Sequence, residues 1–301
     1  MVSYREIFSN LERKYEQAYG FAIFDLDLME SADKIEIRGK VLTENQRAEV
    51  VSEIRKIGEK QIEENIQILS DIKSGQIGWA VVKTDLVDIK SRFVKSVLLN
   101  DKIKKRIQSS QIKKGEILRI IFKKENQVLV QTTDLTMGWV NRADVVLKRK
   151  SLRKSWRKGI FAEPDKLIFV KNPLENIILE AEKFLGVKYI LGANSEKGID
   201  CSGLTQLVYK NAFNIILPRH SWDQKKKGVS INLEKAQTGD LIFMTNKKTD
   251  IKHTGILEVL ADNTKNIIHS SIGSNGVARQ SFNKVASDYN ILEIRRIAQA
   301  T

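Results

Sequence analysis

The chain has 301 residues, 42% of them hydrophobic, and carries 51 Lys and Arg against 37 Asp and Glu, which gives a formal net charge of +14. This length predicts two or three domains, and no stretch approaches the ~20 consecutive apolar residues that cross a bilayer. The single cysteine, Cys201, excludes an intrachain disulfide scaffold and any metal site built from several thiolates. We expect neither a metal nor a cofactor.

The first 72 residues predict a small α/β module. Its elements follow in the order helix, strand, strand, helix, strand, at residues 1–17, 20–28, 34–42, 44–58 and 65–71. Thr43 and Gln46 have the spacing of a capping box, which predicts where the second helix begins. The order of elements in this module, residues 1–72, resembles a BON-type domain, and the resemblance rests on that order alone.

Residues 73–147 predict short strands separated by polar turns, a pattern typical of a small barrel. The order resembles bacterial SH3-like modules, on the segments 113–121, 128–131 and 138–140. Residues 96–112 are expected to form a long loop or a short helix.

Residues 148–172 predict a basic linker. Seven Lys or Arg occur within 148–158, and Gly159, Pro164 and Pro173 then interrupt any regular element. The alternative is a strip that binds a polyanion such as nucleic acid, a membrane surface or an anionic wall polymer. The Lys- and Ile-rich composition of the whole chain would explain the charge without such a partner.

Residues 173–301 place the cysteine at the start of a helix. A helical stripe ends at Gly186, residues 187–200 have the composition of a loop, and helical spacing of apolar residues resumes after Ser202. Three strands are predicted further on, at residues 241–245, 253–260 and 266–271, so that His253 opens one strand and His269 lies within the next.

This placement suits nucleophilic catalysis. The thiolate is the reactive form of cysteine, and the positive end of a helix dipole stabilises an anion, so we expect the pKa of Cys201 to be lowered. Adjacent antiparallel strands can bring His253 and His269 together, one as base and one to orient it. A lone buried cysteine is usually a core residue and a lone histidine a surface residue, so the surrounding motifs decide between these interpretations.

Six ordered segments resemble the signature motifs of the NlpC/P60 cell-wall cysteine peptidases. They are residues 188–192, 198–204, 217–221, 238–243, 253–256 and 267–269. The resemblance implies an α+β chain: a C-terminal papain-like domain with helices packed on an antiparallel sheet, a middle SH3-like β-barrel and the small N-terminal α/β module. The chain departs from the family pattern at Lys188, Leu191 and Ala193, which affects the substrate details rather than the nucleophile.

The resemblance also implies catalytic roles. Cys201 would attack the substrate carbonyl, and His253 would act first as general base and then as general acid. His269 would orient His253.

Four further residues match family positions that line the substrate site: Tyr189, Asp200, Ser202 and Ser221. In members that act on peptides with a free amine, the last three positions help to hold the terminal ammonium, which a carboxylate beside hydroxyls suits. The alternative role for Asp200 is to cap a loop.

The implied reaction is hydrolysis of the bond between γ-D-glutamate and the diamino acid of cell-wall peptides. The SH3-like module would pack on the catalytic domain and restrict cleavage to fragments with a free N-terminal L-Ala. An amidase or acyltransferase on the same fold, or a non-catalytic protein that binds wall or polyanion, remains an alternative. We expect a muropeptide substrate and no nucleic-acid partner.

The N-terminus is polar and lacks the apolar core of a signal peptide. We therefore expect a cytoplasmic protein, with a trimmed leader or leaderless secretion as the alternative.

Overall fold

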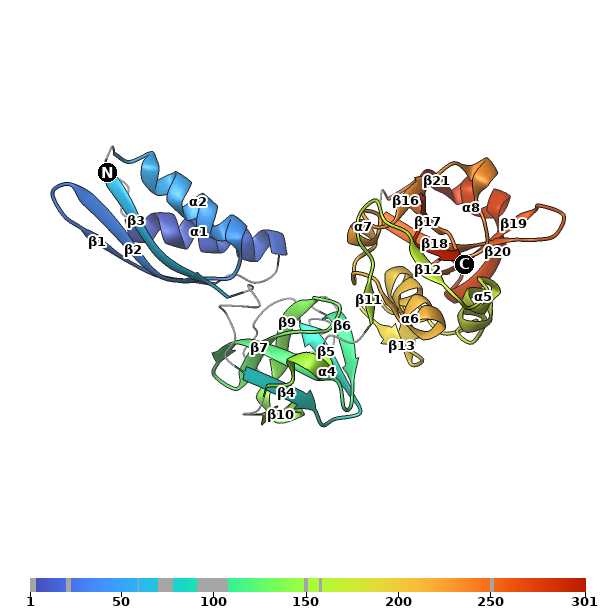
Figure 1. The fold of residues 1–301 in the computed structure, drawn as a ribbon, viewed down its shortest axis with the longest axis horizontal. Coiled ribbons are helices and arrows are strands. Elements are labelled where there is room, and N and C mark those ends of the chain that lie inside the picture. Colours follow the sequence, from blue (N-terminus) through green and yellow to red (C-terminus); the bar gives the residue numbers. More distant parts are fainter. Residues whose placement is uncertain are drawn as a thin grey trace. The chain divides into compact units, whose positions relative to one another are not determined.

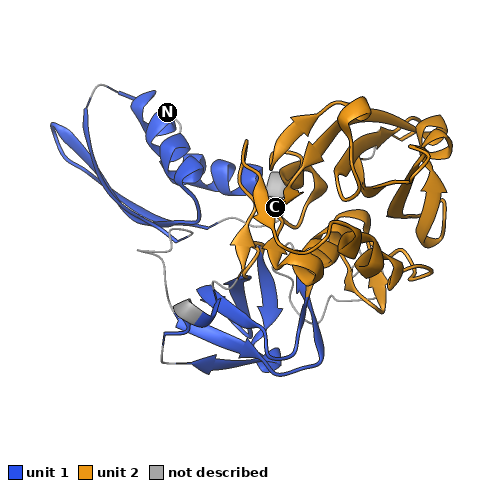
Figure 2. Ribbon diagram, turned by 45° about the vertical axis from the view of Figure 1, so that its right-hand side comes forward, with its two compact units in different colours: residues 1–107, 112–132, 137–156 blue, residues 108–111, 133–136, 157–301 orange. Residues whose placement is uncertain are grey.

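Figure 1 shows the fold of the chain in the computed structural model, which forms two compact units. Unit 1 comprises residues 1–107, 112–132 and 137–156, and unit 2 comprises residues 108–111, 133–136 and 157–301 (Figure 2). The residues that the structure describes are 4–19, 23–58, 60–69, 78–90, 108–148, 151–156, 159–249 and 252–301. No helix in these ranges is both long and apolar enough to cross a membrane.

Unit 1 begins with two helices on one face of a three-stranded sheet. The elements are α1 (Tyr4–Tyr19), β1 (Phe24–Glu30), β2 (Lys34–Val41), α2 (Glu44–Arg55) and β3 (Gln61–Ile68). Strand β2 is central, antiparallel to β1 and parallel to β3. Apolar side chains of both helices and the sheet form one core that includes Phe8, Leu11, Ile35, Ile37, Val50 and Ile54. The predicted order of elements is confirmed.

The predicted capping box at α2 is also confirmed. The Thr43 hydroxyl accepts from the Gln46 N–H at 3.3 Å, and the Gln46 side-chain oxygen accepts from the Thr43 N–H at 3.1 Å. Each of these two N–H groups is therefore satisfied by a side chain only three residues away. The local sequence is thus enough to predict where the helix begins.

A seven-stranded sheet follows. Its strands are β4 (Gly78–Val82), β5 (Leu86–Lys90), β6 (Gln108–Lys113), β7 (Ile117–Lys124), β8 (Gln127–Gln131), β9 (Met137–Asn141) and β10 (Val145–Lys148), with the short 3-10 helix η2 (Arg142–Asp144) before β10. The order β10-β4-β7-β8-β9-β5-β6 leaves β10 and β6 as edge strands. The loop or helix predicted for 96–112 is wrong over 108–112, where β6 forms, and its remainder lies outside the described residues.

The segment predicted as a basic linker contains regular structure. Helix α4 (Arg153–Trp156) buries Trp156, whose ring meets Trp79 edge to face at a centroid distance of 5.6 Å. Two short strands, β11 (Ile160–Phe161) and β12 (Ile168–Val170), pair in parallel with β15 (Ile215–Ile216) and β22 (Ala298–Ala300). These partners lie far along the chain, so the local composition could not reveal the pairing.

Unit 2 is built on a six-stranded antiparallel sheet with the order β16-β21-β17-β18-β19-β20. Its strands are β16 (Val229–Ile231), β17 (Leu241–Asn246), β18 (Lys252–Val259), β19 (Lys265–Ser271), β20 (Gly276–Ser281) and β21 (Tyr289–Arg296). The other elements are α5 (Glu175–Glu182), β13 (Asn194–Ser195), β14 (Gly198–Ile199), α6 (Cys201–Phe213), α7 (Ser221–Gln224), η3 (Leu233–Lys235) and α8 (Phe282–Asp288).

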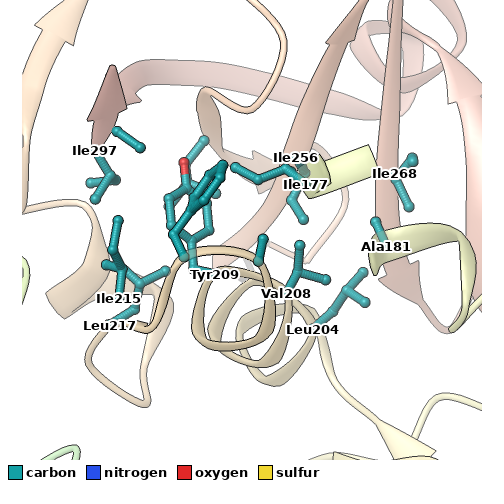
Figure 3. Close-up of a cluster of buried hydrophobic side chains, with 14 of the residues drawn as sticks. Ile177, Ala181, Leu204, Val208, Tyr209, Ile215, Leu217, Ile256, Ile268 and Ile297 are labelled. Atoms are coloured by element: carbon teal, nitrogen blue, oxygen red, sulfur yellow. The ribbon is translucent and has the colours of Figure 1, made fainter. Parts of the chain in front are cut away.

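Both faces of this sheet are covered. Helices α5 and α6 pack on one face, and Figure 3 shows their side chains meeting the sheet in a core that includes Ile177, Leu204, Val208, Ile256 and Ile268. Residues of α8 and the opposite face form a second core that includes Ile242, Met244, Leu257, Ile267 and Val285. The mixed α+β class and the three strands predicted for 241–271 are confirmed.

Replacing Trp156 by Ala should destabilise unit 1. The side chain is 1% exposed, so its removal leaves a cavity against Trp79 and should lower the free energy of unfolding by about 3–5 kcal/mol. Urea titration followed by circular dichroism measures this, with Trp156→Phe as a control that keeps an aromatic ring. Equal stability of Trp156→Ala and the parent protein would show that α4 is a solvated linker.

Candidate active site

The tip of α6 is held by the residue that precedes it. Asp200 is the N-cap, in an extended conformation, and its Oδ1 accepts from the Gly203 N–H at 2.7 Å. Cys201 is therefore the first residue of the helix, as predicted, and it is 8% exposed. The cap satisfies one N–H of the first turn and fixes the direction in which the chain enters the helix.

A buried ion pair fixes Asp200 in turn. Arg219 donates through Nη2 to Oδ2 at 2.7 Å and through Nη1 to Oδ1 at 2.9 Å, and both side chains are almost completely buried. The Gly192 N–H donates to Oδ2 at 2.8 Å, and the Ser202 hydroxyl donates to Oδ1 at 3.3 Å. Sequence reasoning missed Arg219, although it stands inside the segment 217–221 that was singled out as a motif.

The predicted substrate-binding residues fall into two groups. Asp200 and Ser202 belong to the buried network, where Ser202 also accepts from Arg219 at 3.0 Å, so the capping role of Asp200 is present. Tyr189 lies beside both histidines in the wall of a cavity of about 560 Å³. Ser221 begins α7 and lines a smaller pocket together with His253. The role of Asp200, Ser202 and Ser221 towards an ammonium group stays a prediction.

Three neighbouring strands each contribute one side chain to a hydrogen-bonded row. His253 lies on β18, His269 on β19 and Gln280 on β20. His253 Nε2 is 2.7 Å from His269 Nδ1, and His269 Nε2 is 2.9 Å from Gln280 Oε1. The predicted meeting of the two histidines is confirmed, whereas Gln280 was not anticipated.

Gly255 makes room for this row. A Cβ atom at this position would lie 2.6 Å from the Ile267 side chain and 3.0 Å from the His269 Cβ. Any larger residue would therefore push β18 away from the strand that carries His269. This explains why a glycine stands two residues after His253.

The helix tip meets the sheet where two of its strands separate. The paired residues of β18 and β19 begin at Ile256 and Ile268. Before that point the Thr254 N–H donates a hydrogen bond to Cys201, and the Ser270 hydroxyl donates to the Ile199 carbonyl at 2.8 Å. The Cys201 sulfur thus accepts a hydrogen bond from the backbone of Thr254, the residue that follows His253 in the chain.

Tyr289 covers the imidazole of His253. The two rings are stacked, with centroids 4.9 Å apart and planes 17° apart. The Tyr289 hydroxyl is held by the side chains of Asn246 and Ser271. No sequence motif marked Tyr289, because its only signal is an aromatic residue at the start of a strand.

Burial governs the protonation of the site. It raises the pKa of the Cys201 thiol to about 12, and the nearby Asp200 carboxylate adds to this rise, while the Thr254 N–H and Arg219 oppose it. Burial, followed by the neighbouring His269, lowers the pKa of His253 to about 3. Burial also lowers the pKa of His269. The expected lowering of the Cys201 pKa by the helix dipole is therefore wrong for the resting protein, in which thiol and imidazoles are neutral at pH 7.

Comparison with known proteins identifies the region that holds these residues. Residues 186–296 match the model of the NlpC/P60 family. The chain is 34% identical over 119 residues to a probable endopeptidase of Haemophilus influenzae, an alignment that covers 39% of this chain and 71% of that protein. It is 35% identical over 112 residues to the murein DD-endopeptidase MepS/murein LD-carboxypeptidase of Escherichia coli K12, covering 37% of this chain and 56% of that protein.

A third relative is the gamma-D-glutamyl-L-lysine dipeptidyl-peptidase of Bacillus cereus. It is 37% identical over 98 residues, which cover 32% of this chain and 28% of that protein. The chain therefore spans about half of the length of the Escherichia coli relative and less than a third of the Bacillus cereus relative.

Replacing Arg219 by Leu should strongly destabilise unit 2. It leaves the Asp200 carboxylate buried without its cation, which should lower the free energy of unfolding by about 3–5 kcal/mol. Arg219→Lys should lie between Arg219→Leu and the parent protein, because an ammonium keeps the charge but not the two-pronged geometry. Urea titration of the three proteins measures their free energies of unfolding.

A matched control for the ion pair is Lys226→Leu. This change removes a pair with Asp223 in which both side chains are at least half exposed, and it should cost less than about 1 kcal/mol. If Arg219→Leu were no more destabilising than Lys226→Leu, the buried pair would not be what holds the helix tip.

The burial of His253 should make the fold lose stability in mild acid. Its pKa is about 3 in the folded protein against 6.5 as the ordinary value, so between these pH values the unfolded chain binds more protons. The stability that the neutral His253 contributes is thus fully present above pH 6.5 and is lost as the pH falls towards 3. From pH 7 to 5 the parent protein should lose about 2 kcal/mol more than His253→Gln in urea titrations. Equal losses would show that His253 is solvated.

Proposed function

The chain belongs to the NlpC/P60 family, and on this premise we propose that it is a cysteine peptidase that hydrolyses the bond between γ-D-glutamate and the diamino acid of cell-wall peptides. The observation that carries the proposal is the hydrogen bond from the Thr254 N–H to Cys201, which connects the single thiol to the strand that bears His253. The names of the Escherichia coli and Bacillus cereus relatives support the substrate class.

We assign the first chemical step to Cys201 and His253. The thiol proton moves to Nδ1 of His253 while the sulfur bonds to the scissile carbonyl carbon, whose π electrons move to oxygen. Because the resting thiol is protonated, the sulfur becomes nucleophilic only as His253 takes its proton. A backbone N–H group in the first turn of α6 would stabilise the developing oxyanion.

Collapse of this intermediate breaks the carbon–nitrogen bond. The imidazolium of His253 returns its proton to the leaving amine of the diamino acid, which leaves an acyl group on the sulfur. A water molecule then attacks the thioester, giving its proton to His253, and the thiol is restored when that proton returns to sulfur. His269 holds His253 in orientation through both halves of the reaction.

We also infer that the seven-stranded sheet, β4 to β10, is an SH3-like module. Its strands are four to eight residues long and enclose a core of Ala80, Val82, Ile89, Leu118, Ile120, Val130 and Val140. Short strands around a small core are typical of that class. The module would serve the peptidase as an accessory to wall-peptide recognition.

The decisive experiment is incubation with the tripeptide L-Ala-γ-D-Glu-diamino acid, with products identified by mass. We expect release of the dipeptide L-Ala-D-Glu, and we expect Cys201→Ala to lower the rate by roughly 10⁴-fold or more. In water enriched in ¹⁸O, a hydrolase places one heavy oxygen in the released γ-carboxyl group.

Three results would contradict the proposal. Failure of the parent protein to cleave any cell-wall peptide would show that these peptides are not its substrates. Full activity of Cys201→Ala would show that Cys201 is not the nucleophile. Transfer of the acyl group to an added amine, without incorporation of ¹⁸O, would identify an acyltransferase instead.

A further inference from the structure

Gln280 ends the hydrogen-bonded row that begins at His253. In the sheet it pairs with Ile267, two residues before His269, so that its side chain lies on the same face as the histidine. Its Oε1 is 2.9 Å from His269 Nε2. Gln280 also lines the cavity beside both histidines, and none of the six sequence motifs includes it.

The chemistry of an amide oxygen determines the proton positions along the row. In the structure the amide of Gln280 turns its oxygen towards His269, and because an amide oxygen only accepts, Nε2 of His269 carries the hydrogen in this arrangement. A neutral imidazole carries one N–H, so Nδ1 of His269 is left as an acceptor. That atom is 2.7 Å from Nε2 of His253, which must therefore be the donor. Nδ1 of His253 is then the nitrogen that retains a free lone pair.

We propose that Gln280 is a positioning residue that sets the tautomers of both histidines and thereby keeps Nδ1 of His253 available as the base. The inference rests on the proposed function, because it matters to catalysis only if His253 takes the thiol proton. Without an acceptor at position 280, His269 is free to hold its hydrogen on Nδ1. It would then donate to His253 Nε2, and the hydrogen of His253 would occupy Nδ1, where it blocks proton uptake.

A neutral amide serves this purpose better than a charged acceptor. A carboxylate at position 280 would also accept from His269 Nε2, but its charge would favour protonation of His269. A doubly protonated His269 cannot accept from His253. With its oxygen turned towards His269, Gln280 therefore favours this tautomer without raising the pH at which the row becomes protonated.

Other charged or titratable groups face the row from the neighbouring elements. Tyr289 stacks on His253, and Asp288, paired with Lys284 at 3.1 Å, favours the charged form of His269. The remaining groups are the Cys201 thiol on the α6 side and, around the cavity, Tyr189, Lys247 and Lys248. None of these is changed by the substitutions below, so a difference between variants reports on position 280.

The direct test is nitrogen NMR of ¹⁵N-histidine-labelled protein, in which the two tautomers give different shifts. The chain has three histidines, so removing His220 by substitution with Gln leaves signals only from His253 and His269. We expect both rings to carry hydrogen on Nε2. Gln280→Leu should shift both signals towards the opposite tautomer, whereas Gln280→Glu should keep the original one.

Activity on the tripeptide gives the second measurement. Gln280→Leu should lower kcat at neutral pH on the order of 10-fold to 100-fold, because only part of the protein holds a usable base. Gln280→Glu should recover most of that loss, and the acid limb of its kcat/KM profile should move to higher pH, an effect that a merely structural role would not produce. Arg279→Leu is the matched control, because Arg279 is the residue before Gln280 on β20 and pairs with Glu182 and Glu258 instead. It should leave activity and the histidine signals unchanged.

The results separate the inference from the proposed function. An inactive parent protein whose histidines still switch tautomer in Gln280→Leu would support the role of Gln280 and overturn the proposed function. Unaltered tautomers in Gln280→Leu would overturn the inference whatever the activity. Equal losses in Gln280→Leu and Gln280→Glu, with an unmoved acid limb, would overturn it as well.

Discussion

The ion pair between Asp200 and Arg219 is the interaction on which the candidate site depends. A carboxylate and a guanidinium that are both almost completely buried must satisfy each other, because neither has water to do so. The same carboxylate caps α6, and the residue after it is Cys201. The position of the Cys201 thiol is therefore fixed by the place at which Arg219 neutralises the buried Asp200 carboxylate.

This arrangement has an electrostatic consequence for the nucleophile. The first turn of a helix favours an anion, yet here the capping carboxylate already occupies that favourable position. Burial raises the thiol pKa most, and the Asp200 carboxylate, beside which a thiolate would be a second anion, raises it further. The thiol and the imidazoles of the resting site are thus neutral, so the proposed reaction depends on how His253 is oriented.

Hydrogen bonds across the sheet supply that orientation. The row from His253 to Gln280 uses three adjacent strands, and antiparallel pairing brings the three side chains to one face. Gly255 permits the close approach and Tyr289 covers the ring of His253. Since β18 and β19 separate just where the tip of α6 arrives, the sheet accepts the helix without losing a bond from its paired region.

Local patterns in the sequence were sufficient for features whose partners lie a few residues apart. The capping box of Thr43 and Gln46, the helix that starts at Cys201 and the strands of His253 and His269 all depend on spacing within one turn or one strand. Features whose partners are distant in the chain were decided only by the tertiary structure. These features are the ion pair of Arg219 with Asp200, the hydrogen bond between Gln280 and His269, the stacking of Tyr289 on His253 and the pairing of β12 with β22. The protonation of Cys201 belongs with them, because burial is a property of the packed fold and a helix start alone predicted the opposite shift.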